Sequence, residues 1–176
     1  MNLVSLRELA QLVQANKGGR LLGLDVGTSS VGVAISDTVC RIAHVHSAIY
    51  EKLDSPTMVK SAAVIENAVS NEGVIGLVVG SPLDKSGREP QKDVLLHRLY
   101  LQRVHEASRT LAGLPTLFFD ESNTTQIVNS SLRHMAPQPY AVMKPLKDKL
   151  SAVYILQGCL DELARMREEA GGHREE

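Results

Sequence analysis

Apolar residues recur along this chain with two different spacings, which predict where helices and strands lie. A helical spacing of three and four residues occupies residues 1–15 and about 148–167. The cluster Asn16-Lys17-Gly18-Gly19 ends the first of these helices. Three more helices are predicted, at about 55–70, 90–111 and 122–134. The proline-containing stretch 136–145 is predicted to be a loop.

Short apolar runs between turn residues predict five strands. Their approximate bounds are 21–26, 31–36, 42–50, 74–80 and 115–119. Three strands in succession, followed by strands that alternate with helices, indicate one α/β domain with a mixed sheet. We expect a single domain over residues 1–176, with residues 1–19 as a helical extension and residues 168–176 as an acidic, flexible tail.

Composition limits the kinds of partner. The 176 residues carry a formal charge of −1 and only six aromatic side chains, four Tyr and two Phe. These values exclude a broadly basic surface and a base-stacking platform, so any contact with nucleic acid must be local. Since no apolar stretch approaches the roughly 20 residues of a membrane span, we expect a soluble protein. Cys40 and Cys159 lack C-x-x-C spacing and are predicted to be reduced, structural thiols of an intracellular protein.

Asp25 is a charged residue inside an otherwise apolar strand. The alternation of residues 21–26 places it on the face opposite Leu22 and Leu24. A charge in that position needs a partner. If the first two strands form a hairpin, Asp25 lies opposite Gly32, which leaves room for a metal ion or a phosphate. The alternative is a structural aspartate that binds the backbone of the following turn.

Other carboxylates fall at the ends of parallel strands, where α/β proteins bind their ligands. Asp84 follows the fourth strand, and Asp120 and Glu121 follow the fifth. Asp148 lies at the edge of the apolar stripe of the last helix, which directs it toward the sheet. Its alternative role is to cap the first turn of that helix. Asp25, Glu121 and Asp148 could therefore converge as oxygen ligands for Mg²⁺ or Mn²⁺, the ions that clamp a phosphodiester during cleavage.

Four segments follow one another in an order typical of one known family. They are Leu22–Thr28 with Gly32–Asp37, Val78–Asp84 with Gly87 and Pro90-Gln91, Asp120-Glu121 with Thr124-Thr125, and Asp148 with Ser151-Ala152-Val153 and Ile155-Leu156-Gln157. These segments span residues 21 to 161 and resemble the motifs of the YqgF family, also called RuvX. The resemblance implies a ribonuclease H-like fold: a five-stranded mixed sheet of order 3-2-1-4-5, with the second strand antiparallel and helices on both faces.

The resemblance also implies an activity and a site. It implies a metal-dependent nuclease whose catalytic and metal-binding residues are Asp25, Glu121 and Asp148, with Mg²⁺ or Mn²⁺ as cofactor. The implied task is processing of a ribosomal RNA precursor of the pre-16S type, with resolution of Holliday junctions as the alternative. The expected partners are an RNA precursor or branched DNA, at the ribosome and not at a membrane. The expected compartment is the bacterial cytoplasm or, in a eukaryote, an organelle.

The chain departs from the family pattern at two places. Ser29 and Ser30 stand where the family has a basic residue after D-x-G-T, and Ser122 stands where it has the arginine of D-E-R. Both changes remove cations from the expected position of the scissile phosphate. Loop cations could replace them, although a lone surface cation is more often only solvated. The predicted substrate-binding residues are Thr28, Ser29, Ser30, Ser81, Lys85, Arg88, Ser122, Thr125 and Lys147.

Two other functions compete with the nuclease. Sugar kinases and actin-like ATPases share the D-x-G-T-[ST] turn of residues 25–29, but they need a second domain that 176 residues cannot hold. A binding factor for RNA or the ribosome could have kept the fold and lost turnover, which the missing cations favour. Serine-hydrolase and P-loop motifs are absent from the sequence.

Overall fold

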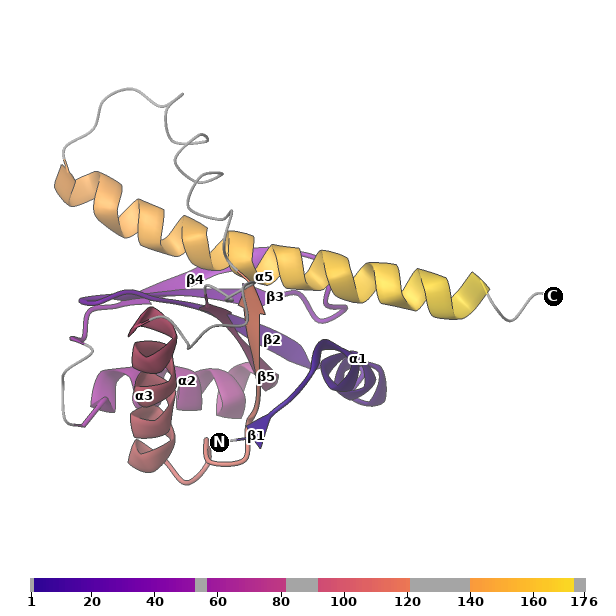
Figure 1. The fold of residues 1–176 in the computed structure, drawn as a ribbon, viewed down its shortest axis with the longest axis horizontal. Coiled ribbons are helices and arrows are strands. Elements are labelled where there is room, and N and C mark those ends of the chain that lie inside the picture. Colours follow the sequence, from indigo (N-terminus) through magenta and orange to yellow (C-terminus); the bar gives the residue numbers. More distant parts are fainter. Residues whose placement is uncertain (1, 53–56, 82–91, 121–139, 173–176) are drawn as a thin grey trace.

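Two hydrophobic cores lie on opposite faces of one six-stranded mixed sheet in the computed structural model, which describes residues 2–52, 57–81, 92–120 and 140–172 (Figure 1). The strands are Asn2–Leu3 (β1), Arg20–Val26 (β2), Val31–Ser36 (β3), Ala43–Ile49 (β4), Val74–Ser81 (β5) and Pro115–Asp120 (β6). The helices are Leu6–Ala15 (α1), Val59–Glu72 (α2), Lys92–Ala107 (α3) and Tyr140–Gly172 (α5).

The strand order is β1-β6-β5-β2-β3-β4. Strand β3 is antiparallel to both β2 and β4, whereas β2, β5, β6 and β1 run parallel. The order predicted for the five longer strands is therefore confirmed. The predicted count of five is wrong, because Asn2 and Leu3 add a parallel edge strand to β6 by pairing with Pro115 and Thr116.

The N-terminal helix begins later than predicted because Ser5 caps it. The Ser5 hydroxyl accepts a hydrogen bond from the backbone N–H of Glu8 at 3.3 Å, and the Glu8 carboxylate accepts one from the backbone N–H of Ser5 at 2.7 Å. This reciprocal pair is a capping box, which fixes a helix start. Residues 2–5 are therefore extended, and a helix from residue 1 is wrong there. The S-x-x-E spacing at Ser5 and Glu8 is the signal that predicts this start.

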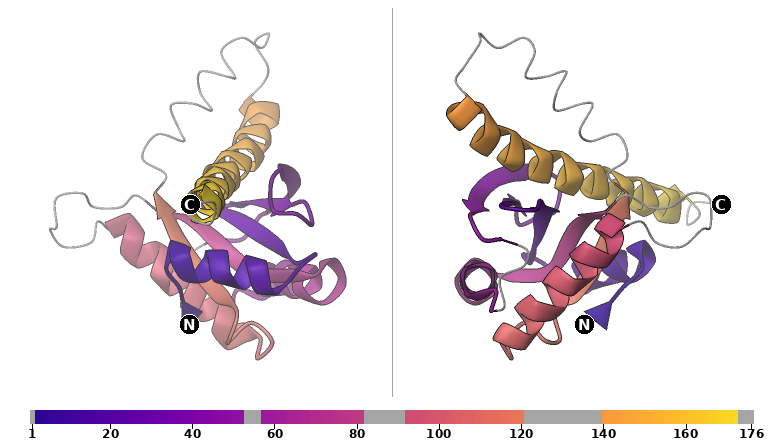
Figure 2. Two further views of the ribbon diagram at one scale, coloured as in Figure 1. Left: turned by 90° about the vertical axis from the view of Figure 1, so that its right-hand side faces the viewer. Right: turned by 60° about the vertical axis from the view of Figure 1, so that its left-hand side comes forward.

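Helices cover the two faces of the sheet in different ways. Helices α2 and α3 pack on the face that holds Leu22 and Leu24, with Tyr100 of α3 fully buried among them. Helices α1 and α5 share the other face with Leu21. The long helix α5 crosses this second face over β2, β3 and β4 (Figure 2). The alternation of β2 therefore directs its odd-numbered residues, Asp25 included, toward the α5 side, as predicted.

The last helix is longer than predicted at both ends. It begins at Tyr140, so the predicted loop is wrong for residues 140–145, and it continues past Arg167 to Gly172. Pro145 lies in its second turn, where the missing proline N–H removes one helical hydrogen bond. The buried stripe from Ala152 to Leu163 compensates by holding the helix against the sheet. The predicted helix over 122–134 lies outside the described residues.

Helix α3 ends earlier than predicted. It stops at Ala107, and residues 108–114 form tight turns in which Leu111 N–H donates to the Ser108 carbonyl at 3.2 Å. Leu111 and Leu114 are nevertheless buried in the α2–α3 core. These two residues are three positions apart, as apolar residues on one face of a helix are. The sequence pattern therefore predicted that the helix continues to about residue 111.

Two simpler predictions were also tested. Cys40 and Cys159 are both buried and free, as expected of structural thiols. Within the described ranges, none of the helices combines the length and the apolar character that crossing a bilayer requires.

Candidate active site

Asp25 lies near the carboxyl end of β2 between two small residues. It pairs with Gly32 of β3, which confirms the predicted hairpin register. On its other side Leu24 pairs with Val79 of β5, so Asp25 and Gly80 follow at the same level of the sheet. The Asp25 side chain is half-buried. The space next to this carboxylate is therefore bounded by backbone and not by large side chains.

Helix α5 approaches the sheet most closely at Gly32. A β-carbon built on Gly32 would overlap the backbone carbonyl of Asp148 and would lie 3.3 Å from Cβ of Ala152. A residue with a side chain at position 32 would push the helix away from β3. The glycine therefore allows the first half of α5 to settle on the β2–β3 hairpin, which brings Asp148 beside Asp25.

Two carboxylates consequently share one partly buried environment. The pKa of Asp25 is raised from its ordinary 3.8 to about 6, first because burial disfavours the charged form and second because the Asp148 carboxylate repels it. A hydrogen bond with Ser151 and the positive charge of Lys147 act in the opposite direction, and they are too weak to restore the ordinary value. Among the described residues, the positive charge of Lys147 therefore does not outweigh burial and the repulsion by Asp148. The predicted proximity of Asp25 and Asp148 is confirmed.

Ser30 orients Asp148. Its hydroxyl donates a hydrogen bond to Oδ2 of Asp148 at 2.8 Å, and its side chain is almost fully buried. The Ser30 carbonyl accepts from the N–H of Gly27 at 3.0 Å, which closes the turn between β2 and β3. Sequence reasoning placed Ser30 among the substrate contacts, whereas the structure directs its hydroxyl to the carboxylate of the last helix.

The remaining predicted residues divide into described and undescribed groups. Thr28 and Ser29 lie exposed in the β2–β3 turn. Ser81, at the end of β5, pairs with Asp120 at the end of β6. Its hydroxyl is buried, and within the described part of the chain it has no hydrogen-bond partner. Lys147 is half-buried near Asp25. Predicted residues that lie outside the described residues are Asp84, Lys85, Arg88, Glu121, Ser122 and Thr125.

The donors at this end of the sheet fit a hard divalent cation. Carboxylate oxygens are the preferred ligands of Mg²⁺ and Mn²⁺. A cation would also offset the repulsion that raises the pKa of Asp25. Among the residues that the structure describes, no group of three acidic, His or Cys side chains could hold a metal ion. Two of the three predicted ligands, Asp25 and Asp148, are thus described, and the third predicted ligand directly follows the last residue of β6.

Two other polar features serve structure. The Asp37 carboxylate accepts from the backbone N–H groups of Arg41 at 2.7 Å and of Ile42 at 3.1 Å. Asp37 therefore caps the turn that follows β3. His46, on edge strand β4, lies 3.0 Å from the carboxylate of Glu72. Neither feature contributes to the site at Asp25.

Sequence comparisons agree with the motifs. Residues 19–162 match the family model described as "RuvX: Holliday junction resolvase". A relative from Sphingopyxis alaskensis, named "Putative pre-16S rRNA nuclease", is 34% identical over 150 residues, which cover 84% of this chain and 90% of the relative. One of the same name from Caldanaerobacter subterraneus is 34% identical over 143 residues, 81% of this chain and 96% of the relative.

Solved structures give a more distant likeness. The structure described as "T. thermophilus RuvC in complex with Holliday junction substrate" covers 84% of this chain and 96% of its own, at 16% identity and a TM-score of 0.47. Membership therefore rests on the sequence matches, which extend over most of the domain and include Asp25 and Asp148. The chain belongs to the RuvX family of Holliday junction resolvases.

Proposed function

We propose that this chain is a divalent-metal-dependent nuclease that hydrolyses phosphodiester bonds in structured nucleic acid. The observation that carries the proposal is the pairing of the Asp25 and Asp148 carboxylates beside Gly32, where burial and mutual repulsion raise the pKa of Asp25 to about 6. Two like charges held together in this way are stabilised by a bound cation. A site of this kind serves phosphodiester cleavage better than it serves passive binding of a polyanion.

The roles follow from the positions of the side chains. Asp25 and Asp148 would hold Mg²⁺ or Mn²⁺, together with Glu121. The bound ion would neutralise charge on the reacting phosphate and favour deprotonation of the attacking water. Ser30 fixes the rotamer of Asp148 through its hydrogen bond. Ser151 does the same for Asp25 from the next turn of α5. Lys147 supplies a nearby positive charge toward the substrate phosphate.

The proposed substrate is the precursor of 16S ribosomal RNA. This choice is supported by the relatives, which carry that substrate in their names and match more than four-fifths of this chain. A branched DNA junction is the second candidate, because the family description names Holliday junctions. Ser29 and Ser122, in place of the expected cations, favour a slow enzyme or one that needs a partner to hold its substrate.

A substrate panel tests the proposal. Precursor rRNA fragments, four-way DNA junctions and single strands are incubated with Mg²⁺ or Mn²⁺, using the wild type, Asp25→Asn and the control Asp161→Asn. Asp161 is an exposed acid on α5, and its variant removes the same single negative charge as Asp25→Asn. We expect metal-dependent cleavage by the wild type and the control, and a decrease of roughly a thousandfold in Asp25→Asn, as expected when several kcal/mol of transition-state stabilisation are lost.

Three outcomes contradict the proposal. Cleavage that persists in Asp25→Asn would place the active site elsewhere. Tight binding of RNA without cleavage under either metal would favour the non-catalytic binding factor. Binding of ATP without cleavage would favour the kinase-like alternative.

A further inference from the structure

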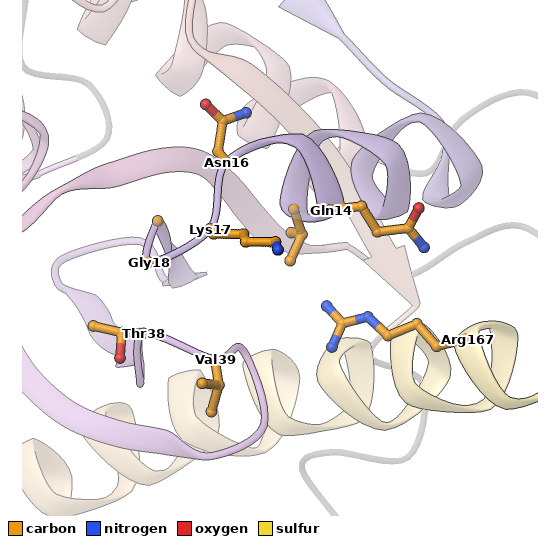
Figure 3. Close-up of a pocket in the computed structure, with 9 residues that line it drawn as sticks. Gln14, Asn16, Lys17, Gly18, Thr38, Val39 and Arg167 are labelled. Carbon is orange, nitrogen blue, oxygen red and sulfur yellow. The ribbon is translucent and has the colours of Figure 1, made fainter.

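A pocket with both apolar and polar lining residues lies away from the carboxylates. It has a volume of about 520 Å³ and is formed by the end of α1, the turn after β3 and the last turns of α5 (Figure 3). Its lining residues are Val13, Gln14, Asn16, Lys17, Gly18, Gly19, Thr38, Val39 and Arg167. None of these residues belongs to the site at Asp25.

The pocket lies at the opposite end of the sheet from Asp25. Gly18 and Gly19 directly precede β2, whereas Asp25 lies near the end of this strand. Arg167 follows Asp148 by nineteen residues of the same helix, a separation of about 28 Å at 1.5 Å per residue. Figure 1 shows α1 under the C-terminal half of α5, far from the half that carries Asp148. One long helix thus connects the two sites.

Two cations from different elements enter this pocket. The Lys17 amine and the Arg167 guanidinium extend toward the same space between α1 and α5 (Figure 3). Among the described residues, no acidic side chain lines the pocket. Neither cation forms a salt bridge with any of them. Nε of Arg167 is buried and has no hydrogen-bond partner in this part of the chain.

The nearby carboxylates do not enter the pocket as partners of Lys17 and Arg167. Asp161 and Glu168 line a separate hollow on another side of Arg167, together with Arg41. Asp37, next to the turn, already accepts two backbone N–H groups. The negative end of the α1 helix dipole explains why a cation, Lys17, follows this helix. It does not explain the position of Arg167, which belongs to α5 and has a buried Nε without a partner among the described residues.

The remaining lining groups suit an oxyanion. Asn16, Thr38 and Gln14 bring neutral polar side chains, and Gly18 adopts a positive φ of 88°, which lets the backbone turn sharply at the pocket wall. Arginine and lysine together with neutral donors are the usual recognition set for phosphate oxygens. Carboxylates would bind too, but a tetrahedral group uses donors from all three segments at once.

We propose that the pocket formed by Lys17, Thr38 and Arg167 binds a backbone phosphate of the nucleic acid, about 28 Å along α5 from the carboxylate site. This inference rests on the proposed nuclease function, which supplies a polyanionic ligand long enough to reach both ends of the helix. The chain lacks two expected cations near the scissile phosphate, at Ser29 and Ser122. Lys17 and Arg167 lie outside the residues that match the family model, so they add a contact beyond the family core.

The first test uses inorganic phosphate and NMR. Phosphate is titrated into the wild type, the double variant Lys17→Gln/Arg167→Gln and the control Arg7→Gln/Arg165→Gln. The control removes two exposed cations, one from α1 and one from α5, and leaves the same net charge. We expect saturable shifts of the Gly19 and Thr38 amide signals in the wild type and the control, and none in the pocket variant.

The second test measures binding of nucleic acid in the Asp25→Asn background, where cleavage does not interfere. A duplex of about 20 base pairs, at roughly 3.4 Å per pair, spans more than the distance between the sites. We expect the pocket variant to bind this duplex about tenfold more weakly than the control, with a salt slope reduced by about 0.7 to 0.9 for the one phosphate lost.

The outcomes separate this inference from the proposed function. Equal affinity of the pocket variant and the control for the duplex would overturn the inference, even if phosphate shifts the amide signals, because the pocket would then serve a free phosphate. An absence of phosphate-induced shifts in the wild type would overturn it as well. Absence of cleavage by the wild type, with pocket-dependent binding retained, would overturn only the nuclease function.

Discussion

The two ends of helix α5 take part in differently built regions of the molecule. Near its start, Asp148 is fixed by the buried Ser30 hydroxyl and by the close contact of the helix backbone with Gly32. Near its end, Arg167 faces Lys17 across an open pocket between α1 and α5. The first region is defined by core packing and the second by the ends of helices. The first region thus brings two carboxylates together, and the second brings two cations together.

This difference indicates what each end can do. Groups held to within a few tenths of an ångström by packing suit chemistry, which depends on exact placement. Cations on exposed segments suit binding of a polyanion, whose strength depends on charge more than on exact geometry. The two regions should therefore respond to substitution in opposite ways.

The largest expected effect is that of Gly32→Ala. The new methyl group would overlap the backbone carbonyl of Asp148, so α5 or β3 must shift. We expect a loss of about 3 kcal/mol in unfolding free energy, at the upper end for overpacking, and a loss of metal binding. Gly113→Ala is the control, because a β-carbon there meets no atom within 4 Å. Urea denaturation of both variants checks the prediction, and equal stability would contradict the proposed close contact.

The next effect concerns pH in the absence of metal. The folded-state pKa of Asp25 is about 6, above its ordinary 3.8, so protonation of this group favours the folded protein. The stability it contributes is complete below the ordinary pKa and is lost as pH rises through about 6. With a chelator present, Asp25→Asn should therefore be more stable than the wild type by about 3 kcal/mol above about pH 6, and equal to it below about pH 3.8. A difference independent of pH would show that Asp25 is not under electrostatic strain.

A smaller effect is expected for Ser30→Ala. The variant removes the hydrogen bond that orients Asp148 and leaves the fold otherwise intact. Loss of a partner that orients a metal ligand lowers metal affinity by roughly 10- to 100-fold. Titration with Mn²⁺ measures this change. Ser29→Ala, one residue earlier and exposed, is the neighbouring control. If both variants bind the metal like the wild type, Ser30 has no positioning role.

The smallest effect is expected at the other end of the helix. Lys17→Gln/Arg167→Gln should leave Mn²⁺ affinity unchanged within error, because the substitutions lie well beyond the 7 to 10 Å over which effects usually couple. Unfolding free energy should change by less than about 0.5 kcal/mol, because neither cation forms a salt bridge with the described residues. A marked loss of metal affinity in this variant would mean that the two ends of α5 are not independent.

The sequence predicted the surroundings of Asp25 well because strands impose a strict alternation. That period placed Asp25 on the α5 face and opposite Gly32, and the helical period of the last helix directed Asp148 toward it. Contacts between segments far apart in the sequence were harder to predict. The hydrogen bond from Ser30 to Asp148 joins residues 118 positions apart, and no local sequence pattern predicts it.

The errors in the fold have similar physical causes. Strand β1 has two residues, too few to show alternation, so it was read as part of a helix. Pro145 suggested a loop, although burial of the rest of α5 outweighs one missing hydrogen bond. The pocket at Lys17 and Arg167 depends on three segments that meet only in the folded chain, so its cations could not be paired from the sequence.

The proposal that Asp25 and Asp148 share a cation is tested most directly by calorimetric titration of Mn²⁺ into the wild type, Asp25→Asn and the control Asp161→Asn. Asp25→Asn should bind the ion at least 100-fold more weakly than the other two, because removing a ligand costs no less than removing its outer partner. If Asp25→Asn binds Mn²⁺ as tightly as the wild type, the paired carboxylates do not form the metal site.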